Sequence, residues 1–324
     1  MKKPLLIVYS DIHFHSYNQF NEGDRRVKDA IKAQKLIKLS AQKYHVPTLF
    51  LGDLFQNEKA LTNKLLSYTL PHFKKIWGNK GEKTYAITGN HDQSEQNTLD
   101  HESPSYVKTL SQVFPGLICM DFKSLEATPG IYLHGIPYLT HDIGLLKAIQ
   151  DIKLIKGKKN ILMLHTTIPG TEDTDGRVIE TDTISSKVLK ILKDFDLVIT
   201  GHIHKPMLIS DNILQVGATN QQRKTDKNCD LGYWIVYSDL SLKFIPLDLP
   251  KFIELDYGVE KPDGKNFYYN KEKVSKEIKF QTEPSKFSNL SDRTSLAENY
   301  LEQKGEKIKK SKKEALIKAL KDTE

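Results

Sequence analysis

Five short apolar runs in this chain end in residues that can bind a divalent cation or transfer a proton. They are LLIVYS followed by DIH, TLFLG by Asp53, TYAITG by NHD, NILML by His165, and DLVIT by the two histidines of GHIHKP. A single HxH is weak, because it is usually a solvated polar turn. Its recurrence with four similar strand ends is stronger, since ligand sites in open α/β sheets gather at the carboxyl ends of strands. We predict that these side chains meet in one cleft.

The residues at these ends combine carboxylate, imidazole and amide groups: Asp11, His13, Asp53, Asn90, His91, Asp92, His165, His202 and His204. This mixture suits a borderline-hard ion such as Mn²⁺ better than an ion that prefers thiolate. One ion could not use them all. Two ions about 3.5 to 4 Å apart, bridged by one carboxylate, would do so, and such a pair promotes in-line displacement at phosphorus. The expected chemistry is attack of activated water on a phosphate ester.

Other roles are open to some of these residues. Asp11, Asp53 and Asn90 could instead cap helices that follow their strands. The remaining histidines fit no ligand motif, and we expect them to be ordinary polar or partly buried residues: His15, His45, His72, His101, His134 and His141.

The elements that position these residues follow from the apolar pattern. Nine runs of Val, Ile, Leu and Tyr, bounded by Gly, Asp and Asn, are typical of buried strands. They are LLIVYS, PTLFLGD, TYAITG, GLICMD, IYLHGI, NILMLH, DLVITG, ILQVGA and YWIVYS. Segments 25–44 and 59–76 carry helical periodicity. We therefore predict an α/β fold with its helices on the outside.

Composition excludes several classes of protein. No segment has the eighteen or so apolar residues of a membrane helix, and the apolar run after the first two lysines is too short for a signal peptide. Cys119 and Cys229 are too few for a disulfide framework, which favours the cytoplasm. The net charge of +7 is spread along the chain, so it does not by itself indicate nucleic acid.

The pattern changes after about residue 250. Ser295 and Glu298 can form a capping box, Gly305 can end that helix, and a second helix is predicted over 306–321. The expected organisation is a catalytic domain over 1–250, a reduced cap or linker over 251–290, and a helical tail over 291–324 that binds a partner.

The motifs DIH, GDLF, GNHD, LHTT and GHIH, in this order, resemble those of the calcineurin-like metallophosphoesterases. Within that superfamily the chain is similar to the SbcD nucleases of double-strand-break repair, through SDIHFH, LFLGDLF, ITGNHD, GIPYL and VITGHIHKP. The likeness covers about residues 5 to 220. It implies a two-sheet metallophosphoesterase sandwich flanked by helices, with a small helical appendage at the C-terminus.

The resemblance also implies a role for each site residue. One metal ion would be bound by Asp11, His13 and His204, and the other by Asn90, His165 and His202. Asp53 would bridge the two ions. His91 would meet the scissile phosphate and protonate the leaving oxygen, with Asp92 orienting its ring.

The activity implied is DNA exonuclease and endonuclease cleavage with two Mn²⁺ ions, for which Mg²⁺ is a weaker substitute. DNA and an SbcC-like SMC ATPase bound by the C-terminal helices are the expected partners, and a homodimer is a further option. The chain is short for an SbcD protein, which favours a compact bacteriophage version. Gln56 also stands where that family often carries Asp.

Two alternatives stay open at this point. A small-molecule or cyclic-nucleotide phosphodiesterase would use the same metal centre, and a non-catalytic scaffold would keep only the fold. A protein phosphatase is disfavoured, because GDLFQN lacks the arginine of the phosphatase motif GDxxDRG and the third motif ends in NHD rather than NHE.

Overall fold

The computed structural model describes residues 2–17, 19–57, 61–79, 81–95, 103–179, 186–256, 259–260 and 264–270. All of them belong to one compact unit, Met1–Lys271. The predicted tail over 291–324 and much of the predicted segment 251–290 lie outside the described residues. Among the helices that can be described, none is long and apolar enough to cross a membrane.

The first sheet has six strands in the order β12-β11-β1-β2-β3-β4. Their bounds are β1 Pro4–Tyr9, β2 Thr48–Phe50, β3 Thr84–Ala86, β4 Leu117–Cys119, β11 Gly232–Tyr237 and β12 Leu242–Pro246. Strands β1 to β4 are parallel, whereas β11 pairs antiparallel with both β1 and β12. The parallel order brings the carboxyl ends of β1, β2 and β3 to one edge.

The second sheet also has six strands, in the order β5-β6-β7-β8-β10-β9. Their bounds are β5 Lys123–Thr128, β6 Ile131–Gly135, β7 Lys159–His165, β8 Leu197–Gly201, β9 Met207–Ser210 and β10 Ile213–Gln215. The four inner strands are parallel and the two outer ones are antiparallel to their neighbours. The strands that lead to His165 and His202 are therefore adjacent and point the same way.

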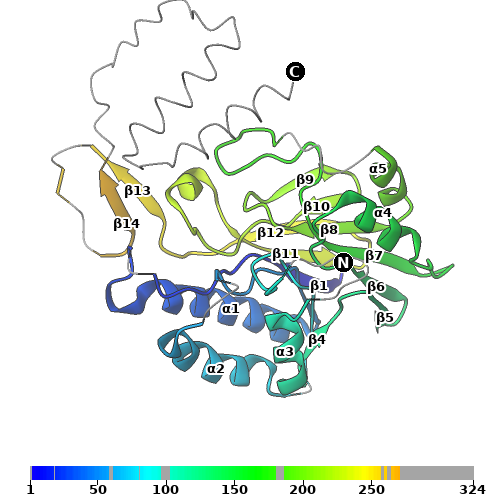
Figure 1. Ribbon diagram of the computed structural model, residues 1–324, viewed down its shortest axis with the longest axis horizontal. Helices are drawn as coiled ribbons and strands as arrows, with labels where there is room; N and C mark the ends of the chain where they lie inside the picture. Colours follow the sequence, from blue (N-terminus) through cyan, green and yellow to red (C-terminus); the bar gives the residue numbers. More distant parts are fainter. Residues whose placement is uncertain are drawn as a thin grey trace, which may run out of the picture. The chain divides into compact units, whose positions relative to one another are not determined.

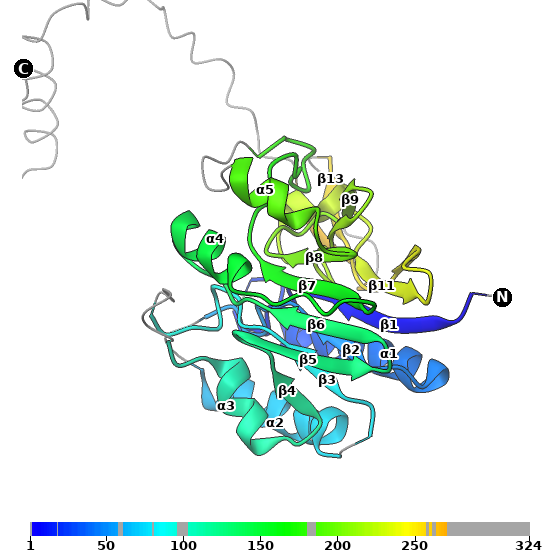
Figure 2. The ribbon, with the colours of Figure 1, turned by 90° about the vertical axis from the view of Figure 1, so that its right-hand side faces the viewer.

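Helices cover the outer faces of the two sheets. Helices α1 Arg25–Tyr44, α2 Asn63–Trp77 and α3 Tyr106–Val113 lie on the first sheet, and α4 Asp142–Gln150 and α5 Ser186–Leu192 lie on the second (Figures 1 and 2). The predicted α/β sandwich of two sheets flanked by helices is confirmed. Short 3-10 turns, η1 Glu22–Asp24 and η2 Lys224–Asn228, complete the loops near the site.

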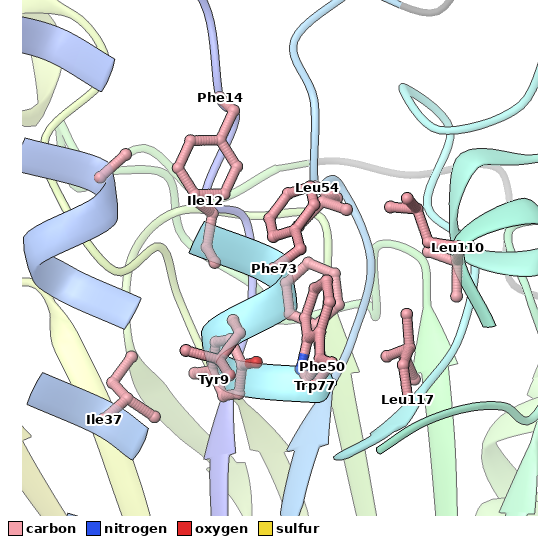
Figure 3. Close-up of a cluster of buried hydrophobic side chains, with 14 of the residues drawn as sticks. Tyr9, Ile12, Phe14, Ile37, Phe50, Leu54, Phe73, Trp77, Leu110 and Leu117 are labelled. Atoms are coloured by element: carbon pink, nitrogen blue, oxygen red, sulfur yellow. The ribbon is translucent and has the colours of Figure 1, made fainter. Parts of the chain in front are cut away.

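Alternation along the strands explains the layers. On β1, Ile7 and Tyr9 join the apolar cluster under the helices, while Leu6 and Val8 join the cluster between the sheets. A strand buried on both faces has no polar position, which is why it is a continuous apolar run. Figure 3 shows the first of these clusters, where the rings of Phe73 and Trp77 stack with their centroids 4.8 Å apart.

A small two-stranded sheet lies beside helix α1. Strand β13 Phe252–Leu255 pairs in parallel with β14 Phe267–Asn270. The rings of Phe252 and Phe267 approach the guanidinium of Arg26, at 5.2 and 4.8 Å from ring centroid to Cζ. This contact ties the end of the described chain to the beginning of α1.

Candidate metal centre

Backbone hydrogen bonds join the turns that follow β1 and β2. The amide of Asp11 donates to the carbonyl oxygen of Gly52 at 3.1 Å, and the amide of His13 donates to that of Asp53 at 3.0 Å. His165, the last residue of β7, donates from Nδ1 to the carbonyl oxygen of Leu51 at 2.5 Å. Segments from both sheets are thereby held at one edge.

The glycines in these turns allow the segments to approach closely. A Cβ atom at Gly89 would lie 2.2 Å from Oδ1 of Asp53, and one at Gly201 would lie 2.7 Å from the carbonyl oxygen of Leu51. Neither contact is sterically allowed. The glycine of each motif is therefore required by packing between the turns.

Four of the predicted ligands have a left-handed backbone. The φ angles are +51° at Asp11, +50° at His13, +59° at Asp53 and +88° at His202. Such conformations are costly for residues other than glycine and concentrate at functional sites, where the surrounding structure enforces them. The buried hydrogen bonds between the turns provide that enforcement here.

The first group of candidate ligands is Asp11, His13 and His204. Nε2 of His13 lies 3.3 Å from Nε2 of His204 and 3.7 Å from Oδ1 of Asp11. Oδ2 of Asp11 accepts the amide of His202, whereas its buried Oδ1 has no hydrogen-bond partner among the described residues. Two imidazole nitrogens and an unsatisfied carboxylate oxygen that face one another fit a shared divalent cation.

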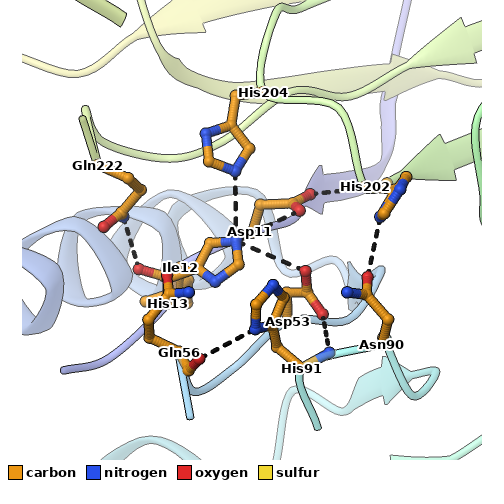
Figure 4. A network of polar contacts seen from close by, with 12 residues as sticks. Asp11, Ile12, His13, Asp53, Gln56, Asn90, His91, His202, His204 and Gln222 are labelled. Carbon is orange, nitrogen blue, oxygen red and sulfur yellow. Dashed lines mark hydrogen bonds and ion pairs between the residues drawn. The ribbon is translucent and has the colours of Figure 1, made fainter. Parts of the chain in front are cut away.

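The second group is Asp53, His165 and His202, with Asn90 between the two histidines. Oδ1 of Asn90 lies 3.1 Å from Nε2 of His165 and 2.9 Å from Nδ1 of His202. An amide oxygen and two imidazole nitrogens again converge on one place. All seven predicted ligands are thus brought together. Figure 4 shows Asp11, His13, Asp53, Asn90, His202 and His204 facing one another.

Asp53 connects the two groups. Its Oδ2 lies 3.5 Å from Nε2 of His13 and 3.4 Å from Nε2 of His165, while its Oδ1 accepts the amide of His91 at 2.9 Å. One oxygen is held by the backbone and the other is directed at imidazoles from both groups. This arrangement fits the predicted bridging role.

Charge in this buried site shifts the histidines in opposite directions. Burial alone would lower the pKa of His165, but the Asp53 and Asp11 carboxylates raise it to about 9. Burial and the neighbouring His165 charge lower the pKa of His202 to about 4. Although burial opposes ionisation of Asp53, the His165 and His13 rings hold its pKa far below the usual range. The two carboxylates concentrate negative charge where cations would bind.

His91 lies beside the first group. One ligand atom from each of His91, His13 and Asp53 lies within 4.8 Å of the others. Its Nδ1 donates to the backbone carbonyl oxygen of Gln56 at 2.9 Å. This contact holds the ring through Nδ1, so Nε2 is the nitrogen not engaged by it. The backbone of Gln56 makes this contact, so the contact does not depend on the side chain at this position.

The predicted contact between Asp92 and the His91 ring needs correction. The buried carboxylate of Asp92 instead accepts backbone amides, from Asp53 and Leu54 at 2.8 Å and from Gly89 at 3.1 Å. Burial and the Asp53 charge raise the pKa of Asp92 to about 7. Asp92 joins the turns after β2 and β3, and so it positions Asp53 rather than His91.

Two residues outside the predicted site set also lie next to the centre. Oδ2 of the buried Asp226 lies 3.5 Å from Nδ1 of His204, which orients that ring in the way that carboxylates orient metal-binding histidines. The ring of Tyr138 lies 5.7 Å from that of His202 between centroids. Tyr138 lies in the GIPYL segment, whereas nothing in the local sequence marks Asp226.

Comparison with a family model identifies the family of this chain. Residues 5–206 match the family described as calcineurin-like phosphoesterase. Among solved structures, a dimetal phosphatase from Danio rerio is similar at 10% identity over 72% of this chain and 93% of that chain, with a TM-score of 0.45. The protein TT1561 of Thermus thermophilus is similar at 12% identity over 74% and 97%, with a TM-score of 0.42. The chain belongs to the calcineurin-like phosphoesterase family.

Proposed function

We propose that this phosphoesterase is a Mn²⁺-dependent DNA nuclease that cleaves phosphodiester bonds during recombination and repair. The observation that carries the proposal is the pair of ligand groups joined by Asp53, with His91 beside them. DNA is favoured by the similarity of SDIHFH, LFLGDLF, ITGNHD and VITGHIHKP to the SbcD nucleases. A bacteriophage origin and action in the cytoplasm are parts of the same proposal.

The chain's own residues supply binding, orientation and a proton. Asp11, His13 and His204 would hold one ion, and Asn90, His165 and His202 the other. When bound, two divalent ions supply an activated water and offset charge on the phosphoryl oxygens. The Gln56 carbonyl fixes Nδ1 of His91, so that Nε2 can pass a proton to the leaving oxygen.

The nature of the ligands indicates Mn²⁺. Four imidazoles suit Mn²⁺ better than Mg²⁺, which prefers near-octahedral oxygen sites and loses water reluctantly. Activity should therefore be strong with Mn²⁺ and weak with Mg²⁺, each at saturation. Equal rates with the two ions would contradict the proposed ion.

Cleavage of labelled DNA tests the proposed activity. Linear duplex and single-stranded oligonucleotides are incubated with Mn²⁺, beside cyclic nucleotides and bis(4-nitrophenyl) phosphate, and the Asp53→Asn variant controls for contaminating nucleases. Degradation of DNA by the wild-type protein alone is the expected result. Preference for a cyclic nucleotide would indicate a small-molecule phosphodiesterase, and no cleavage of any ester would indicate a scaffold.

An SMC-like ATPase is the proposed partner, and DNA the proposed substrate of the assembly. Leu316, Ile317 and Leu320 recur along one side of the predicted helix over 306–321, which suits docking in a groove. Deletion of residues 290–324 should remove ATPase association and ATP-stimulated duplex digestion, while Mn²⁺-dependent activity on short single strands is kept. Co-purification of the truncated protein with the ATPase would contradict this proposal.

A further inference from the structure

A cavity of about 360 Å³ lies next to the metal centre and is not used by it. Two of its lining residues contact the centre directly. Gln56 accepts from His91 through its carbonyl oxygen, and Gln222 donates from Nε2 to the carbonyl oxygen of Ile12, between the ligands Asp11 and His13. A molecule in the cavity would therefore be a close neighbour of a phosphate at the centre. Figure 4 shows the contacts of Gln222 with Ile12 and of Gln56 with His91.

The charge of this cavity is positive. Arg26, Arg223 and Lys224 line it, together with neutral residues and no carboxylate. Arg223 is exposed, and its Nε lies 3.6 Å from Oδ1 of Asp226. The Nζ atom of Lys224 lies over the ring of Tyr269. An anionic group on the ligand would be attracted here.

Arg26 makes the strongest case for an anion. Its side chain is only 4% exposed, and its Nη2 donates to neutral acceptors, the carbonyl oxygen of Gln222 at 2.9 Å and Nε2 of His15 at 3.4 Å. Its Nη1 is buried without a hydrogen-bond partner, and the carboxylates of Asp29 and Asp226 act on its charge without a close ion pair to Arg26 among the described residues. A buried cation without a paired charge is costly. The two carboxylates are not in contact with Arg26, so its charge still attracts an anion in the cavity.

Aromatic side chains form another part of the wall. Tyr17, Phe20 and Phe252 line the cavity, and the Phe20 and Phe252 rings pack at 5.2 Å between centroids. The Tyr17 ring lies 4.9 Å from that of His15 between centroids, and Tyr17 is 51% exposed, so part of its ring can still stack on a flat ligand. Aromatic faces next to cations are the combination that binds bases and phosphates of single strands.

We propose that this cavity binds the nucleotide adjacent to the scissile phosphodiester. Its phosphate lies against the positive wall of Arg26, Arg223 and Lys224, and its base stacks on Tyr17. This inference rests on the proposed nuclease function, because it requires a strand that extends beyond the cleaved bond. It places substrate selection in residues outside the ligand set, in loops and at the start of α1.

Two substrates separate this subsite from the metal centre. Bis(4-nitrophenyl) phosphate has one phosphate and no base, whereas a short single-stranded oligonucleotide reaches beyond the centre. Tyr17→Ala and Lys224→Ala should each raise KM for the oligonucleotide about tenfold, since stacking and phosphate contacts are of that size. Hydrolysis of bis(4-nitrophenyl) phosphate should change less than about twofold, the scatter expected for an untouched site.

Arg26 is tested by a matched pair, because its removal could disturb folding. Arg26→Gln should raise KM for the oligonucleotide, and Arg26→Lys should restore part of the loss by keeping the charge. Thermal melting checks the fold of both. Lys190→Ala, which removes an exposed cation from α5 on the other sheet, controls for the loss of a charge.

The outcomes distinguish this inference from the function on which it rests. Wild-type protein that hydrolyses bis(4-nitrophenyl) phosphate but not DNA would overturn both. Cleavage of DNA with KM unchanged in Tyr17→Ala and Lys224→Ala would overturn the subsite alone. An equal loss on both substrates in folded variants would also overturn it, because the cavity would then act only through the structure of the centre.

Discussion

The metal centre and the neighbouring cavity are built in different ways. The centre is formed by turns at the ends of parallel strands, and Asp11, Asp53 and His165 are at most 1% exposed. The cavity is formed by loops, by the start of α1 and by β13, and it includes Tyr17 at 51% exposure. Buried strand ends hold ligands in fixed positions, whereas loops can change without affecting them. Chemistry and substrate choice are thus carried by separable parts.

Of the changes predicted here, replacement of Asp53 should have the largest effect, because it should remove the chemistry for every substrate. Asp53→Asn removes the charge shared by the two groups. Metal affinity should therefore fall by more than the roughly 10- to 100-fold that is typical when a residue hydrogen-bonded to a metal ligand is replaced. Activity on every ester should be lost with it. Calorimetry with Mn²⁺ checks the affinity, and Asp194→Asn, an exposed acid after α5, is the control. Normal Mn²⁺ binding by the variant would contradict the bridging role.

His91→Asn should separate chemistry from metal binding. We expect kcat to fall by about 10² to 10⁴-fold, the usual contribution of a general acid, while two ions remain bound. The exposed His141, which precedes α4, provides the control His141→Asn. A loss of metal in the His91 variant, seen by anomalous scattering, would mean that the ring is itself a ligand.

Asp226→Asn should weaken one metal more than the other. The carboxylate orients His204 and touches no residue of the second group, so affinity at the first site should fall about 10- to 100-fold. Two-site calorimetry with Mn²⁺ resolves the effect, with Asp211→Asn as an exposed control. An equal loss at both sites would show that Asp226 supports the fold as a whole.

The smallest expected effect is a release of protons when metal binds. His165, with its pKa raised to about 9, is protonated at about pH 7.5 in the metal-free protein and must lose that proton to become a ligand. About one proton should therefore be released at His165, and Mn²⁺ affinity should rise with pH up to about 9. Calorimetry in buffers of different ionisation enthalpy measures the release. The absence of any release at this pH would contradict the role of His165.

The inner part of the fold could be predicted from sequence, and the outer part could not. All nine predicted strands occur, because strands buried on both faces are continuous apolar runs. Helix α1 matches the predicted segment 25–44, since Val27, Ala30, Ala33, Ile37 and Ala41 line its buried face. Strand β5, KSLEAT, was missed because it lies at a sheet edge and is mostly polar. Helices α4 and α5 are short, so the apolar periodicity of their sequences is too weak to predict them.

The candidate site divides in the same way. The ligands were predicted because each follows a recognisable strand, and the shared edge of the sheets brings them together. Asp226 and Arg26 carry no local signal, since their importance depends on contacts with His204 and Gln222 from distant parts of the chain. The contact expected of Asp92 was wrong because adjacency in sequence did not reveal that its carboxylate faces backbone amides.

The most direct test of the central claim is the number and position of bound ions. Crystals of the full chain soaked in Mn²⁺ should show two anomalous peaks about 3.5 to 4 Å apart on either side of the Asp53 carboxylate. The ion at one peak should be bound by Asp11, His13 and His204, and the ion at the other by Asn90, His165 and His202. A single peak, or two peaks that do not share Asp53, would contradict the two-metal account.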